Sequence, residues 1–288
     1  MDWELRIGDE LVPGRWIQQL LGGGERYQAF LTWNDDLLCP TVVKILRPDQ
    51  VDNPAARRTI ANEGKLLKRL DHPYVMRLLG QDTEGERPFI ELEFLDGPRL
   101  STLIRRHGIL SGEQLFPLGR QLAAAVHYLH RRGLLHLDVK PRNVIMGPVP
   151  RLIDLSIARR IGEVGRIRSP IGTDAYMSPE QCDRALLATI GPAADVWGIG
   201  VTMYEAASKQ LPFPRGRRGG TDLERWPQLE GEAAPLPPKV SRAVAGAIVP
   251  CLDRDPGRRP TPEALFEAFD DLAATHGRRR RRLSRRSA

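Results

Sequence analysis

The chain has 288 residues, of which 41% are hydrophobic and 27% are charged, which is typical of a folded globular protein rather than a disordered one. No apolar run approaches the ~20 residues that span a bilayer, and the acidic start at residues 1–4 is unlike a signal peptide, so we expect a cytoplasmic protein. The formal net charge of +7 equals the seven arginines between residues 278 and 288, so the rest of the chain is neutral and no specific nucleic-acid site is indicated.

Residues 1–95 read mainly as strands. Short apolar runs lie between turn signals at 26–33, 41–46 and 89–94. One helix is predicted over 54–70, because Asn53 can cap it and Pro54 suits its first turn.

After Gly97 the pattern becomes helical. Apolar residues recur on one helical face between 115 and 129, and residues 195–208 are apolar on nearly all sides, as in a central buried helix. A short hairpin is predicted at 144–153, a surface excursion at 214–238, and two more helices at 239–252 and 262–275. Strands followed by helices predict an α+β fold in two lobes, a small β-rich one with one helix and a larger, mainly helical one.

A glycine-rich segment at 21–27 lies between two predicted strands. Glycine lets the backbone approach phosphate oxygens and offer N–H donors, although adjacent glycines also make an ordinary turn. In a later strand, Lys44 faces away from Val43 and Ile45, either into solvent or toward an acidic partner. Glu63 is a candidate partner, because it lies on the apolar face of the 54–70 helix, where a lone charge is costly.

The segment 136–143 carries the strongest chemical signal. It contains an acid (Asp138), a base (Lys140) and an amide (Asn143), and Asp154 ends the second hairpin strand. The hairpin can bring Asn143 and Asp154 side by side, and their oxygens suit Mg²⁺. Asp138 would then be free to accept a proton from an incoming hydroxyl. Taken singly, Asp138 could be a turn former and Asp154 a helix cap, but this joint spacing favours a reaction site.

A series of short motifs, in one order, resembles the eukaryotic-type (Hanks-type) protein kinases, and in particular their bacterial serine/threonine members. The motifs are Gly22-x-Gly24, Val43-Lys44, Glu63, Glu93-Phe94-Leu95, His136-x-Asp138-x-Lys140-x-x-Asn143, Asp154-Leu155-Ser156, Gly172-Thr173, Ser178-Pro179-Glu180, Asp195-Val196-Trp197 and Asp255-Pro256-x-x-Arg259-Pro260. The resemblance covers residues 12–275. It implies the bilobal kinase fold, with an N-lobe at 1–95, a C-lobe at 96–276 and a disordered Arg-rich tail at 277–288.

The resemblance also implies a chemistry: ATP as phosphate donor, Mg²⁺ or Mn²⁺ as metal, and protein Ser/Thr hydroxyls as acceptors. The implied catalytic residues are Asp138 for the acceptor hydroxyl, Lys140 for the transferring phosphate, and Lys44 paired with Glu63 for the α- and β-phosphates. The implied ATP-binding residues are Leu21, Gly22, Gly23, Gly24, Lys44, Leu92 as gatekeeper, Glu93, Leu95, Asn143 and Asp154, with Asn143 and Asp154 also holding the metal. Lys140 together with Thr173 implies Ser/Thr substrates, and Glu180 and Arg259 are expected to form a buried ion pair.

Three positions depart from the family pattern. Tyr27 stands where the third glycine of the loop is usual, and Ser156 replaces the last glycine of Asp-Phe-Gly. Leu137 replaces the arginine that normally binds a phosphorylated activation loop. None of the three removes a catalytic group, so we expect an active Ser/Thr kinase in bacterial signalling. The alternative is a pseudokinase, an ATP-binding scaffold with weak or no activity. A small-molecule phosphotransferase is disfavoured, because the motifs at 172–180 belong to a peptide-substrate platform.

Two further expectations concern regulation and location. Ser169 is the expected acceptor of autophosphorylation, and activity should not require it, because Leu137 cannot pair with a phosphate. The arginines of the tail repel one another, which predicts disorder. They could hold the protein at an anionic membrane surface at about 1 kcal/mol each, or bind another polyanion, or remain solvated without a partner.

Overall fold

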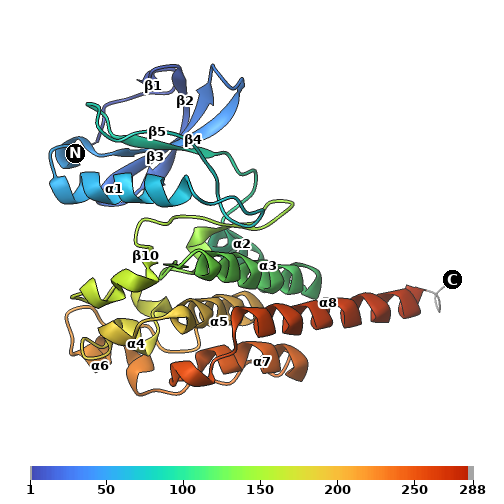
Figure 1. The fold of residues 1–288 in the computed structure, drawn as a ribbon. Helices are drawn as coiled ribbons and strands as arrows, with labels where there is room; N and C mark the ends of the chain where they lie inside the picture. The colour runs from blue at the N-terminus through green and yellow to red at the C-terminus, as the bar shows by residue number, and fades with distance from the viewer. Residues whose placement is uncertain (1, 285–288) are drawn as a thin grey trace. The chain divides into compact units, whose positions relative to one another are not determined.

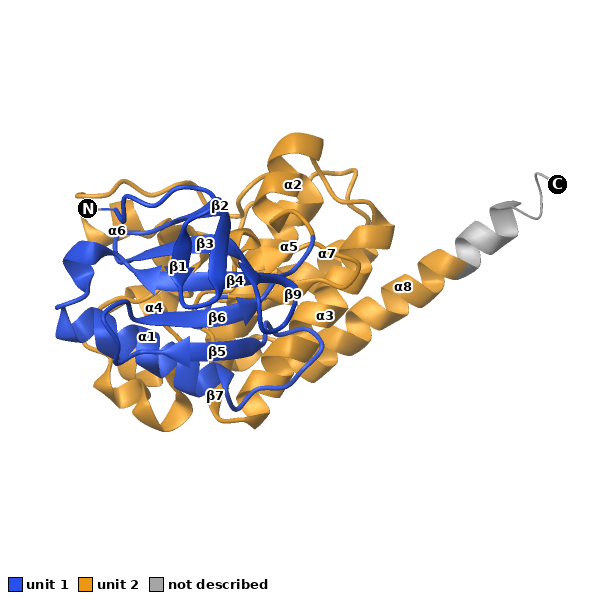
Figure 2. Cartoon of the chain, turned by 90° about the horizontal axis from the view of Figure 1, so that it is seen from above, with its two compact units in different colours: residues 1–96, 154–156 blue, residues 97–153, 157–288 orange. Residues whose placement is uncertain are grey.

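The computed structural model describes residues 2–284, with side chains through Gly277. The chain forms two compact units, each described by itself (Figure 2). Unit 1 comprises residues 1–96 and 154–156, and unit 2 comprises residues 97–153 and 157–288. The boundary therefore falls one residue later than the predicted one, and Asp154–Ser156 group with unit 1 although hairpin residues precede them in the chain.

Unit 1 is built on a six-stranded antiparallel sheet in the order β1-β2-β3-β4-β6-β5 (Figure 1). The strands are β1 (Glu10–Val12), β2 (Arg15–Gly23), β3 (Tyr27–Asn34), β4 (Cys39–Leu46), β5 (Leu78–Asp82) and β6 (Phe89–Glu93). In β4, Val43 and Ile45 are fully buried in an apolar cluster with Phe30. Since side chains alternate along a strand, Lys44 lies on the opposite face, as predicted.

The helix of unit 1 is α1 (Pro54–Leu67), which lies along the sheet and packs on β4, β5 and β6 (Figure 1). It begins as predicted, because the Asn53 side chain accepts hydrogen bonds from the backbone N–H groups of Ala55 and Ala56, at 3.0 and 3.3 Å. The regular helix ends at Leu67 rather than at residue 70, and tighter turns continue to Leu70.

Unit 2 is mainly helical, with two short antiparallel β-pairs. Its helices are α2 (Leu100–His107), α3 (Gly112–Arg131), α4 (Pro179–Cys182), α5 (Pro192–Ser208), α6 (Asp222–Arg225), α7 (Arg242–Ile248) and α8 (Pro262–Ser284). The β-pairs are β7 (Leu134–Leu135) with β10 (Arg159–Arg160), and β8 (Val144–Ile145) with β9 (Arg151–Leu152). The α+β class is therefore confirmed.

The predicted central helix is α5, which packs against α3 and α7. Trp197 and Tyr204 of α5 are fully buried, which explains why the sequence is apolar around the whole helix. The predicted surface excursion at 214–238 contains α6 and is tied down by Trp226, of which only 3% is exposed.

The last helix is longer than predicted. α8 continues through Ser284, so it includes residues 277–284, which the sequence analysis assigned to a disordered tail. Arginine is a good helix former, and no proline or capping glycine interrupts the run, so the established helix can propagate. Cations near a helix C-terminus also favour the helix dipole. The rest of the predicted tail, residues 285–288, lies outside the described residues.

Within residues 2–284, no helix combines the length and the apolar character needed to cross a bilayer.

Candidate active site

In unit 1, Lys44 contacts two carboxylates. Its Nζ donates to Glu63 Oε2 at 2.8 Å and Oε1 at 3.1 Å, and to Asp154 Oδ1 at 3.1 Å. Glu63 lies on the buried side of α1 and is 1% exposed, so the ammonium group supplies the partner that its charge requires. The predicted Lys44–Glu63 pair is confirmed, and Asp154 joins it.

The electrostatics of this cluster favour the charged forms of Lys44 and Asp154. Burial by itself favours neutral Lys44, but the carboxylates of Glu63 and Asp154 outweigh it and hold the pKa of Lys44 above its ordinary value. Burial also disfavours ionised Asp154, but Lys44 and a hydrogen bond from the Ser156 backbone N–H (3.3 Å) hold the pKa of Asp154 below its ordinary value. Asp154 is therefore ionised at neutral pH.

Tyr27 forms a third contact to Lys44, which the sequence analysis missed. Its ring centre lies 4.7 Å from Lys44 Nζ, a cation–π geometry. In the β3·β4 register Ala29 pairs with Lys44, so Tyr27, two residues earlier, points to the same face. Tyr27, at the position where a glycine is usual, therefore helps to hold Lys44. The register between β3 and β4 is the signal from which this contact could have been predicted.

The glycine-rich segment forms a tight turn between β2 and β3. Gly22 has φ +118°, a conformation that side chains rarely adopt. A Cβ on Gly23 would lie 2.2 Å from the Tyr27 carbonyl oxygen, whereas one on Gly24 would meet no heavy atom within 4 Å. The turn is fixed by hydrogen bonds from the Gly24 N–H to the Tyr27 carbonyl (3.0 Å) and from Arg47 Nε to the Gly24 carbonyl (2.7 Å). Leu21 precedes the turn and is 39% exposed.

The predicted adenine-binding stretch follows β6. The gatekeeper candidate Leu92 is 5% exposed within that strand. The strand ends at Glu93, whose backbone N–H donates to the Arg77 carbonyl at 3.1 Å and whose carboxylate accepts from Arg77 Nη2 at 3.1 Å. Leu95 follows in irregular structure.

In unit 2, the predicted catalytic residues converge on the Asp138 carboxylate. Oδ1 accepts from Thr173 Oγ1 at 2.7 Å, and Oδ2 accepts from Lys140 Nζ at 2.5 Å and from Asn143 Nδ2 at 3.0 Å. Lys140 also donates to Thr173 Oγ1 at 2.6 Å. The structure thus brings together residues of the catalytic loop, 136–143, and of the activation segment, 157–178, and the Thr173 hydroxyl is engaged at the catalytic loop.

The catalytic loop is held by a buried carboxylate of α5. Leu137 has φ +65°, which is strained for a branched residue. Its N–H donates to Asp195 Oδ1 at 2.7 Å, and its carbonyl accepts from Gln181 Nε2 at 2.9 Å. Asp195 Oδ2 accepts from the His136 N–H and from His130 Nε2, both at 2.9 Å. Burial opposes ionisation of Asp195, but these hydrogen bonds outweigh it and lower its pKa.

Glu180 and Arg259 form the predicted buried ion pair, with Nη1–Oε1 at 2.7 Å and Nη2–Oε2 at 2.9 Å.

Ser156 is not among the residues with positive φ, so its backbone does not require the glycine that the family usually has there.

A link that the sequence did not predict joins the activation segment to the 214–238 excursion. The Asp174 carboxylate accepts from Trp226 Nε1 at 3.0 Å and from Arg225 Nη2 at 3.1 Å. Asp174 directly follows Thr173, so this link steadies the residue that touches Asp138. No local pattern marks such a contact across 52 residues.

The predicted metal ligands lie in different units, Asn143 in unit 2 and Asp154 in unit 1. Each is ordered within its own unit by the contacts given above, and their pairing around a metal stays a prediction.

Comparisons with known proteins agree with this geometry. Residues 16–269 match the model of the protein kinase domain. The chain is 30% identical over 287 residues to the serine/threonine-protein kinase pkn2 of Myxococcus xanthus, covering 93% of this chain and 33% of that protein. It is 29% identical to the probable serine/threonine-protein kinase PkwA of Thermomonospora curvata (91% and 35%) and 25% identical to the serine/threonine-protein kinase PrkC of Bacillus subtilis (91% and 40%). The chain thus spans between a third and two fifths of these relatives. It belongs to the protein kinase family and is similar to its bacterial serine/threonine members.

Proposed function

We propose that the chain is a serine/threonine protein kinase domain that transfers the γ-phosphate of ATP to protein hydroxyls in bacterial signalling, with Mg²⁺ or Mn²⁺. The observation that carries the proposal is the Asp138 carboxylate, which accepts hydrogen bonds from Lys140, Asn143 and Thr173. Such a carboxylate is positioned to orient an acceptor hydroxyl and to take its proton.

The chemistry follows from the roles of these groups. The hydroxyl oxygen of the substrate forms a bond to the γ-phosphorus, the bond between that phosphorus and the leaving ADP oxygen breaks, and the hydroxyl proton passes to the Asp138 carboxylate. Lys140, already 2.5 Å from Asp138, offsets negative charge that develops on the transferring phosphoryl group. Lys44 would bind the α- and β-phosphates, held in place by Glu63 and Asp154.

The residues present fit a divalent cation. Asp154 is held ionised, and the amide nitrogen of Asn143 is bonded to Asp138, which leaves the amide oxygen for a metal. A bound Mg²⁺ would neutralise charge on the ATP phosphates.

The test is transfer of labelled phosphate from ATP to a generic protein acceptor, with and without a metal chelator. We expect Asp138→Asn to lower the rate by about 100-fold or more, since a positioned base contributes 10²–10⁴-fold. Asp271→Asn, on the exposed side of α8, is the matched control and should keep the rate.

Equal transfer by wild type and Asp138→Asn would contradict the assignment of Asp138. Binding of ATP without any transfer would instead support the pseudokinase alternative. Loss of transfer with the chelator supports the metal requirement.

A further inference from the structure

Arg47 directly follows β4 and contacts the glycine-rich turn twice. Its backbone N–H donates to the Arg26 carbonyl at 2.9 Å, and its side-chain Nε donates to the Gly24 carbonyl at 2.7 Å. The Arg47 side chain is 21% exposed, so it lies against the protein rather than free in water. One residue outside the turn therefore holds two of its carbonyl groups, in a segment whose glycines have little conformational preference of their own.

The N-terminal segment, residues 2–5, in its turn holds Arg47. The Asp2 carboxylate pairs with Arg47 Nη1, and Trp3 Nε1 donates to the carbonyl of Leu46, the residue before Arg47, at 2.7 Å. Trp3 also packs against the apolar cluster of the sheet. Apolar packing thus fixes this segment to unit 1, and its carboxylate binds the side chain that holds the turn.

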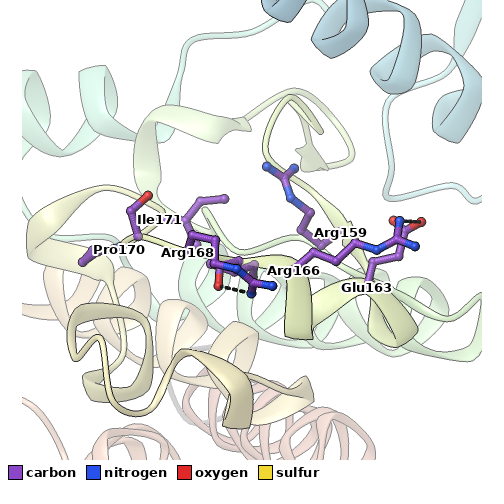
Figure 3. A pocket seen from close by; sticks show the side chains of 8 residues that line it. Arg159, Glu163, Arg166, Arg168, Pro170 and Ile171 are labelled. Atoms are coloured by element: carbon purple, nitrogen blue, oxygen red, sulfur yellow. Dashed lines mark hydrogen bonds and ion pairs between the residues drawn. The ribbon is translucent and has the colours of Figure 1, made fainter.

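Arg47 differs in reach from two arginines of unit 2 that also bond to backbone carbonyls. Arg159 and Arg168, which line a cavity in unit 2, donate to carbonyls no more than three residues away in the chain (Figure 3). The bond from Arg47 to Gly24 spans 23 residues. It therefore joins the end of β4 to the turn between β2 and β3, which a local contact cannot do.

The contact with Arg47 determines the direction of a backbone N–H group. The peptide bond between Gly24 and Glu25 is trans, so its C=O and N–H point in opposite directions. With the carbonyl bonded to Arg47, the Glu25 N–H faces the other side of the turn. Within residues 2–284 no group accepts from this N–H, and Glu25 is exposed. A charged donor on the carbonyl also polarises the peptide group and makes its N–H a stronger donor.

We propose that Arg47 is a positioning residue of the nucleotide site, which fixes the Gly24–Glu25 peptide so that the Glu25 N–H donates to a phosphate of the nucleotide. The N-terminal segment supports Arg47 through Asp2. This role rests on the proposed function, because it concerns the same nucleotide. Without Arg47 the turn has more conformations to lose when a phosphate binds, so the affinity for phosphates falls.

The test measures binding rather than transfer, so it does not depend on catalysis. A non-hydrolysable ATP analogue and adenosine, which has no phosphate, are titrated with Mg²⁺ into the full chain by calorimetry. Arg47→Met keeps an apolar side chain and removes the donor. Arg58→Met, at an exposed position on α1, removes the same charge and is the matched control. Asp2→Asn, which weakens the hold on the guanidinium group, is a second variant should Arg47→Met fold poorly.

We expect the analogue to bind about tenfold more weakly to Arg47→Met, as for loss of a hydrogen bond from a charged group, and normally to Arg58→Met. Asp2→Asn should show a smaller loss of about twofold to threefold, in the range of exposed ion pairs. Adenosine should bind to all the chains alike, because the turn acts on phosphates. A defect of folding would instead weaken the binding of both ligands.

Equal affinity of wild type and Arg47→Met for the analogue would overturn the role of Arg47 and leave the proposed function intact. Equal weakening of analogue and adenosine binding, or equal weakening by Arg58→Met, would overturn it as well. If Arg47→Met does not fold, full affinity of Asp2→Asn for the analogue overturns the role. If wild type itself binds no analogue, the proposed function fails, and the role of Arg47 fails with it.

Discussion

Lys44 is a buried cation whose surroundings explain both its charge and its role. Carboxylate oxygens of Glu63 and Asp154 lie 2.8 and 3.1 Å from its ammonium nitrogen, and the centre of the Tyr27 ring lies 4.7 Å from the same atom. Because these contacts already restrict the Lys44 side chain to one conformation, it loses little conformational entropy when it binds phosphate.

Replacing Lys44 by methionine should lower phosphoryl transfer by about 100-fold or more, as for loss of a positioned charge in other active sites. The fold should persist, because burial already raises the pKa of Glu63 and this carboxyl can bind a proton once its partner is gone. Initial rates and circular dichroism measure the two effects. Lys65→Met, exposed on α1, is the control, and near-normal activity of Lys44→Met would show that the role of Lys44 is wrong.

Leu137 accounts for a second prediction at the residue scale. Its side chain packs with Ile157, Ile167 and Ile171, so hydrophobic contact holds the activation segment where an arginine–phosphate pair would otherwise do so. Phosphatase-treated protein should therefore keep at least about half of its activity, because these contacts need no phosphate. The measurement compares rates before and after treatment, with intact mass confirming removal of phosphate. Loss of nearly all activity would contradict the prediction.

At the scale of elements, the β2–β3 turn depends on one glycine more than on its neighbours. A Cβ at Gly23 would meet the Tyr27 carbonyl at 2.2 Å, and this backbone oxygen cannot move without breaking the hydrogen bond from the Gly24 N–H. At Gly24 the same atom would point into open space.

Gly23→Ala should therefore lower the free energy of unfolding by about 1–3 kcal/mol, in the range of other overpacked sites. Gly24→Ala, the matched control, should change it by less than about 0.5 kcal/mol, as at ordinary surface positions. Denaturant unfolding measures both. Similar values for the two variants would show that the turn rearranges freely.

At the scale of the whole molecule, the charge is concentrated at the C-terminal end. The seven arginines between residues 278 and 288 equal the net charge of +7, so the remaining chain is neutral. α8 carries the chain through Ser284, which places five of these arginines within a helix.

We predict that this end binds anionic vesicles at low salt and is released at high salt, with about 1 kcal/mol for each arginine near the surface. Replacing the five arginines at 278–282 by glutamine keeps good helix formers and should remove most of the binding. Cosedimentation with phosphatidylserine vesicles measures it, and neutral vesicles are the control. Equal binding by the two chains would show that the arginines are not the anchor.

Much of the candidate site could be predicted because its signals are local. Alternation in β4 placed Lys44 opposite Val43 and Ile45, and the cap at Asn53 fixed the start of α1 and with it the face that carries Glu63. The identities of Asp138, Lys140 and Asn143 followed from spacing within one short loop. Such features depend on backbone periodicity and on hydrogen bonds between near neighbours, which the sequence specifies directly.

The remaining contacts were decided by the tertiary structure. Thr173 reaches Asp138 across 35 residues, Trp226 reaches Asp174 across 52, and Leu137 lies in an apolar cluster with the activation segment. The length of α8 was also not predicted from the sequence. Repulsion between the arginines indicated a disordered tail, but arginine has a high helix propensity, and adding residues to an existing helix avoids the cost of nucleating a new one. The physical reason is common to the three long-range contacts: each one forms because the packing of distant segments brings them together, and no periodicity within one segment records which partner it will meet.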